Sequence, residues 1–139
     1  MKLYITARAD TAPEGYEVCP VVYGNIDLTN IPDNSCTEVV AIESIDFTAR
    51  DQIQDFLKKV VSKLRSGAIT TIVGIDMHEL GRRACHRIIT ADEFNNIINE
   101  RLSISPASEI LDVLRQHGLS IVSYKTVQGM SYEIKAARK

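Results

Sequence analysis

Acidic side chains follow two predicted strands of this chain, at positions where a parallel sheet can bind ligands. Glu43 and Asp46 come after the predicted strand 37–42, and Asp76 comes after the apolar strand 68–75. Ligands of wound α/β sheets bind at the carboxyl ends of the strands, so these carboxylates are candidate ligand contacts. A solvated loop or a helix entry explains Glu43 and Asp46 about equally well, and an N-cap role explains Asp76 as well.

Three side chains that often ligate metals follow closely. His78, Cys85 and His86 have a spacing that matches no common zinc pattern, because zinc sites usually pair two short-spaced ligand sets. We therefore expect no metal site.

A basic cluster, Arg82, Arg83 and Arg87, could hold a phosphate or an acidic partner, although such clusters are more often solvated helix faces. No serine or cysteine stands in a nucleophile motif, and neither a Walker-type glycine loop nor a dinucleotide glycine fingerprint occurs. Redox and phosphoryl-transfer chemistry are therefore poorly supported.

The helix and strand that precede Asp76 have the clearest pattern in the chain. Apolar residues spaced for one helical face predict a helix over about 49–65: Ile53, Phe56, Leu57, Val60, Val61 and Leu64. Thr48 is the expected N-cap, and Gly67 is the expected left-handed residue that ends the helix. Residues 69–73 are all β-branched, which fits a strand that is buried on both faces.

The other predicted elements give a mixed sheet, mostly parallel with an antiparallel edge, in a single domain over 1–139. Between Thr6 and Tyr16 there is no room for a full crossover helix, so one sheet face should be thinly covered, and a partner subunit could cover it. The expected strands are 2–6, 16–23, 26–28, 37–42, 68–75, 119–125 and 130–136, and the expected later helices are 79–87, one capped by Thr90 that runs to about 102, and one opened by Ser105-Pro106 that Gly118 stops.

Composition limits the class of protein. The chain has 139 residues, 45% of them hydrophobic and 24% charged, with a formal net charge of −2, which gives no general attraction to nucleic acid or anionic membranes. No apolar run approaches the roughly 20 residues that span a bilayer, and Leu3-Tyr4-Ile5 is too short for a signal peptide. Three cysteines are an odd number without a pairing pattern, so we expect reduced thiols and a cytoplasmic location.

The order of elements and several short passages resemble class I S-adenosylmethionine-dependent methyltransferases over nearly the whole chain. The resemblance implies an α/β fold with a mostly parallel, Rossmann-like sheet and a C-terminal antiparallel hairpin, shortened in its N-terminal half. The passages that carry it are Lys2-Leu3-Tyr4-Ile5, Pro13-Glu14-Gly15-Tyr16, Asp27-Leu28 with Ile31-Pro32-Asp33-Asn34-Ser35, Val39–Phe47, Leu57–Val73 with Leu64-Arg65-Ser66-Gly67, Leu114–Gly118 and the final hairpin.

The resemblance also implies a cofactor site for S-adenosylmethionine. Its residues would be Thr6, Ala7, Arg8 and Asp10 after the first strand, Glu17 on the second, Asp27 and Leu28 on the adenine side, and Glu43 and Ser44 after the fourth.

The family's first strand runs into a glycine-rich turn that lets the backbone approach the cofactor closely. This chain has no glycine there before Gly15, so the motif is degenerate, and Arg8 puts a long cation in that space. The acid expected at the end of the second strand is also displaced, since Glu17 is offset by two residues.

Two hypotheses remain open. The chain could be a methyltransferase that acts on a small molecule or a glycan, with catalytic residues that the sequence does not identify. Alternatively, it could be a non-catalytic methyltransferase-like domain that acts as a binding or assembly module, as a homodimer or with a protein partner. The missing glycines, Arg8 and the short length favour the second hypothesis.

Overall fold

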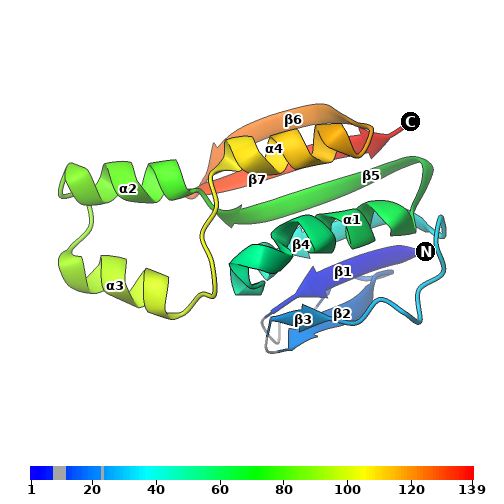
Figure 1. Ribbon diagram of the computed structural model, residues 1–139, viewed down its shortest axis with the longest axis horizontal. Helices are drawn as coiled ribbons and strands as arrows, with labels where there is room; N and C mark the ends of the chain where they lie inside the picture. Colours follow the sequence, from blue (N-terminus) through cyan, green and yellow to red (C-terminus); the bar gives the residue numbers. More distant parts are fainter. Residues whose placement is uncertain (8–11, 23) are drawn as a thin grey trace.

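The computed structural model describes residues 1–7, 12–22 and 24–139. In these residues the chain forms a seven-stranded sheet of order β3-β2-β1-β4-β5-β7-β6 (Figure 1). Strands β2, β1, β4 and β5 are parallel, β7 is antiparallel to β5 and β6, and β3 is antiparallel to β2. The strands are β1 (Lys2–Thr6), β2 (Glu17–Val22), β3 (Asn25–Ile26), β4 (Cys36–Ile42), β5 (Leu64–Ile75), β6 (Leu119–Val127) and β7 (Ser131–Arg138). The predicted mixed sheet with a C-terminal antiparallel hairpin is confirmed.

Two helices cover one face of this sheet. Helix α1 (Ile53–Lys63) contacts β5 and α4 (Ala107–Gln116), and α4 contacts β6 and β7. The strand residues that alternate toward these helices are buried and form the core with the apolar faces of α1 and α4: Leu3, Ile5, Val39, Ala41, Ile72 and Ile134. The period of two along each strand therefore decides which residues enter the core.

The opposite face of the sheet carries no helix in the described part of the chain, and we call it the bare face. Val18, Val22 and Ile69 on it are 52%, 53% and 41% exposed. Parallel sheets are normally covered on both faces, so this is a departure from the usual architecture. The connection between β1 and β2 consists of only the ten residues 7–16, fewer than the dozen or so that a full crossover connection needs.

The remaining helices lie at the carboxyl edge of the sheet. Two short 3-10 helices, η1 (Ser44–Phe47) and η2 (Arg50–Gln52), follow β4, while α2 (Met77–Cys85) and α3 (Ala91–Asn99) follow β5 and project beyond the sheet (Figure 1). Asp76 caps α2 by accepting from the His78 N–H at 3.1 Å, and Thr90 and Glu93 form a reciprocal capping box on α3, as their positions predict.

The bounds around α1 differ from the prediction. The Thr48 hydroxyl donates to the Ser44 carbonyl at 2.9 Å at the end of η1, and α1 begins only at Ile53, so the predicted Thr48 N-cap is wrong. Strand β5 begins directly at Leu64. Gly67, with φ of +80°, therefore lies within β5 rather than at the helix end.

Candidate functional site

A pocket of about 410 Å³, here called the edge pocket, lies at the carboxyl edge of the sheet. Its lining comes from Ala7 after β1, Val21 of β2, Gly24, Phe47 of η1, the last residue of α3 (Asn99) and residues 100–102 after it. The strand order reverses between β1 and β4, and ligands of open α/β sheets bind at such a switch point. The edge pocket is therefore the first candidate for a ligand site.

A second pocket of about 320 Å³, here called the helix pocket, lies between α2 and α3. Its lining is mainly apolar, with Leu80 of α2, Phe94 and Ile98 of α3, and Ile104 beyond α3. Arg101 and Leu102 line both pockets, so they form the wall between them. An apolar cavity of this kind suits an apolar or aromatic group better than a sugar.

Arg101 of this wall forms a buried ion pair with Asp46. The Arg101 Nε donates to the Asp46 carboxylate at 3.3 Å, and their side chains are only 6% and 2% exposed. The Ile75 N–H also donates to this carboxylate, at 3.1 Å, and the Arg101 guanidinium lies 5.9 Å from the centre of the Phe47 ring. The pair fixes η1 against β5 and the segment after α3.

Burial raises the pKa of Asp46 to about 7, against the lowering effects of the Ile75 hydrogen bond and of Arg101. The negative charge of Glu43 raises this pKa further. A carboxyl group that titrates near neutrality at the carboxyl edge is a candidate acid or base, although buried structural pairs show the same shift.

The hydroxyl of Tyr132 on β7 lies beside this pair and is buried without a hydrogen-bond partner among the described residues. Burial, followed by the charges of Asp46 and Asp76, raises the pKa of Tyr132 well above its usual value. A Cβ atom on Gly74 would lie 2.7 Å from this hydroxyl and 2.9 Å from an Asp46 oxygen. Only glycine therefore fits between Tyr132 and Asp46.

Four of the predicted site residues meet at the carboxyl edge. Ala7 lines the edge pocket, and Thr6 is buried at the end of β1. The Ser44 hydroxyl donates to the Ile5 carbonyl at 2.7 Å, so it joins the ends of β4 and β1. Glu43 adopts the left-handed conformation with φ of 57°, which turns the chain into η1.

Three others lie elsewhere. Glu17 begins β2 and pairs with Leu3, so it lies toward the amino ends of the strands. Because β3 runs antiparallel to β2, Asp27 is carried away from the carboxyl edge, and Leu28 is buried in the core. Arg8 and Asp10 lie outside the described residues.

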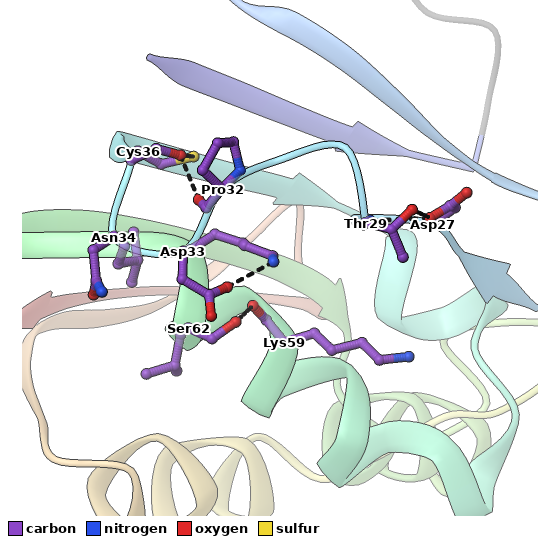
Figure 2. Close-up of polar contacts among 12 residues, drawn as sticks. Asp27, Thr29, Pro32, Asp33, Asn34, Cys36, Lys59 and Ser62 are labelled. Atoms are coloured by element: carbon purple, nitrogen blue, oxygen red, sulfur yellow. Dashed lines mark hydrogen bonds and ion pairs between the residues drawn. The ribbon is translucent and has the colours of Figure 1, made fainter.

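The Asp27 carboxylate is held in its own turn (Figure 2). It accepts from the Thr29 hydroxyl at 2.6 Å and from the Thr29 N–H at 3.0 Å. The Thr29 hydroxyl is the main cause of its lowered pKa. Asp27 therefore acts here as a turn residue.

The side chains of α2 form no common site in the described residues. No group of three His, Cys, Asp or Glu side chains there could hold a metal ion. Arg82 pairs with Glu79 at 2.9 Å, and Arg83 donates to the Gly129 carbonyl at 2.9 Å, so these two arginines point to different partners. Among the described helices, none is long and apolar enough to cross a membrane.

Arg101 and Tyr132 are the site residues that sequence reasoning missed. Arg101 is 55 residues from Asp46 and lies after α3, where no spacing rule relates it to the end of β4. Tyr132 sits in an ordinary alternating strand, so its pattern indicates only a core position. The sequence predicted a helix that runs to about residue 102, so Arg101 was expected on that helix, with no signal of a buried partner.

Comparison with known proteins places this geometry in a fold family. No family model and no curated protein sequence matches the chain. Solved structures do match. One is a SAM-dependent methyltransferase of Thermotoga maritima, described as a possible histamine N-methyltransferase, with a TM-score of 0.63 and 15% identity over 90% of this chain and 65% of that one.

The fold is that of the class I S-adenosylmethionine-dependent methyltransferases. A second similar structure is the complex between the Haloferax volcanii Trm112 methyltransferase activator and a putative methyltransferase. The matching chain has a TM-score of 0.64 and 8% identity, over 98% of this chain and 81% of its own length. The Burkholderia thailandensis 1,6-didemethyltoxoflavin-N1-methyltransferase, solved with bound 1,6-didemethyltoxoflavin and S-adenosylhomocysteine, has a TM-score of 0.58 and 13% identity, over 89% of this chain and 51% of that one. The chain thus spans about two thirds of the Thermotoga protein and half of the Burkholderia protein.

Proposed function

We propose that this chain is a non-catalytic methyltransferase-like domain that acts as an assembly module. The bare face supports this proposal, because a sheet face on which no described residue forms a helix presents a broad, partly apolar surface to a partner. Among the structural neighbours, one structure is the complex of the Trm112 methyltransferase activator with a protein described as a putative methyltransferase, which is compatible with a protein partner here.

The described lining of the edge pocket fits S-adenosylmethionine poorly. Val21 and Val22 end strand β2, where the resemblance leads one to expect an acid for the ribose hydroxyls, and neither can accept a hydrogen bond from them through its side chain. Asp27 and Glu17, the two candidate acids, lie away from this edge. Glu100 is the one carboxylate in the described lining, and its side chain is 62% exposed on the far wall.

Calorimetric titration with S-adenosylmethionine and S-adenosylhomocysteine tests the proposal. We expect no measurable heat of binding with millimolar ligand for the folded protein. Binding of either ligand with a micromolar dissociation constant would contradict the proposal, because it would mean that the glycine-poor edge still forms a cofactor site.

A second candidate function is methyl transfer from S-adenosylmethionine to a small molecule. It is favoured by the two adjoining pockets, since a cofactor in the edge pocket and an acceptor in the helix pocket would meet at Arg101 and Leu102. Methyl transfer requires mainly positioning of two reactants in a pocket that excludes water. The apolar lining of the helix pocket favours an apolar small molecule over a glycan as acceptor. Micromolar cofactor binding would support this candidate.

A further inference from the structure

The strand register of the bare face places one row of side chains on each side of a central row. A row of paired residues, Ala41, Ile72 and Ile134, crosses β4, β5 and β7 and points to the helices on the other face. The residues before and after this row point to the bare face. They form two parallel rows, with Val40, Thr71 and Lys135 in one row and Ile42, Val73 and Glu133 in the other.

A two-fold axis laid along the central row exchanges these two rows between two copies. Val40 of one copy then lies opposite Ile42 of the other, and Thr71 lies opposite Val73. Lys135 lies opposite Glu133, and the dyad repeats this opposite-charge contact once. Two aliphatic side chains therefore meet at Val40 and Ile42, the Thr71 side chain meets Val73, and opposite charges meet at Lys135 and Glu133, which gives the self-complementary contacts of an isologous interface.

We infer that the bare face binds a second copy of this chain, with the two sheets packed face to face and their strands nearly antiparallel. This inference rests on the proposed function and names the partner of the assembly module. Two sheets pack well about 10 Å apart with their strands within about 30° of a common line, which this arrangement allows. Each copy thereby supplies the second layer that the other's sheet lacks.

The polar groups of the face are compatible with this arrangement. Lys125 on β6 pairs with Glu133 of the same chain at 3.4 Å, so Glu133 would lie between two lysines, one from each copy. Tyr4 lies in the same row as Val40. Tyr16 packs edge-on against Tyr4 at 6.2 Å and lies 5.4 Å from the Lys2 ammonium, so an aromatic pair occupies the β1 part of the face.

The size of the face predicts the strength of the dimer. Six neighbouring strands take part, in the sheet order β2-β1-β4-β5-β7-β6. With about 4.8 Å between strands and about 3.3 Å per residue over roughly five residues of each strand, the face measures roughly 29 by 16 Å. Two such faces bury on the order of 1,000 Å², near the lower end of specific interfaces. We therefore expect a dimer that dissociates at micromolar concentrations.

Sedimentation equilibrium of charge-reversal variants tests the arrangement. Lys135→Glu alone would place two like-charged acid pairs across the dyad, and Glu133→Lys alone would place two like-charged lysine pairs there. Each variant should self-associate at least about tenfold more weakly than the wild type. Mixed in equal amounts, the two variants should form a heterodimer, because every Lys then faces a Glu again.

Lys58→Glu is the matched control, since Lys58 is exposed on α1 and makes the same change of charge away from the bare face. It should leave self-association unchanged. A wild-type chain that stays monomeric at several hundred micromolar would overturn the inference and leave the face to a different occupant. So would single variants that dimerise like the wild type, or a mixture that fails to associate. Cofactor binding, measured separately by calorimetry, would contradict the proposed function but would not change the molecular masses that sedimentation equilibrium measures.

Discussion

At Asp46, burial and the neighbouring groups have opposite effects on the pKa of the carboxyl group. Its carboxyl group is 2% exposed, accepts a hydrogen bond from the Ile75 N–H and pairs with Arg101. Burial nevertheless dominates and raises its pKa from 3.8 to about 7. The folded protein therefore binds a proton at Asp46 between about pH 4 and pH 7 that the unfolded chain has already lost.

Stability should consequently fall as the pH rises through this window and change little from Asp46 above it. Between pH 5 and pH 8, the wild type should lose on the order of 2 kcal/mol of unfolding free energy relative to Asp46→Asn, which cannot ionise. Urea denaturation of both proteins at several pH values measures this difference. If the wild type instead gained stability relative to Asp46→Asn as the pH rose, the pair with Arg101 would dominate over burial.

At this scale, the sequence predicts local contacts better than distant ones. The Asp76 and Thr90 caps follow from rules that act over two or three residues, and both are present. The Asp46–Arg101 pair spans 55 residues and depends on how α3 returns to the sheet. Similarly, the position of Asp27 depends on the antiparallel direction of β3, which the residue types in that segment do not predict.

Asp76 connects several elements at the end of β5. Its carboxylate accepts from the His78 N–H at the start of α2 and from the Ala107 N–H at the start of α4, at 3.1 and 3.3 Å. The side chain is nearly fully buried, so water cannot readily replace it. One carboxylate thus satisfies donors at the first turns of two helices.

Asp76→Ala should lower the unfolding free energy by roughly 2–3 kcal/mol, since it removes a helix cap and leaves a buried N–H without a partner. Asp76→Asn keeps an amide oxygen in the same place and should cost clearly less. Thermal or urea unfolding of the two variants makes the comparison. Equal losses in both would show that the negative charge, rather than the accepted hydrogen bonds, is what stabilises these helix ends.

The elements themselves were largely predictable because alternation and helical periodicity act along the chain. Residues 2–6 form the predicted first strand without adjustment. The helix before β5 was predicted too long because its apolar face reaches Leu64, which is buried as the first residue of a strand. A buried residue is apolar whether it lies in a helix or in a strand, so the apolar pattern does not show where α1 ends and β5 begins.

For the whole molecule, the short connection between β1 and β2 has the largest consequence. Helices α1 and α4 form one layer, and in the residues that the structure describes no helix lies on the other side of the sheet. The sequence predicted this thin coverage from the spacing of Thr6 and Tyr16. The self-complementary arrangement of Glu133 and Lys135 required the strand register, because it depends on which residues are paired across β4, β5 and β7.

Hydroxyl-radical footprinting of the wild type at increasing protein concentration tests the central claim most directly. Val18, which lies in the same row as Val40 on the bare face, should lose reactivity from low micromolar to several hundred micromolar protein. Ile88 and Leu102, which are 53% and 55% exposed elsewhere, should keep theirs. Unchanged reactivity of the bare face, or protection of Leu102 and Ile88 instead, would contradict the account.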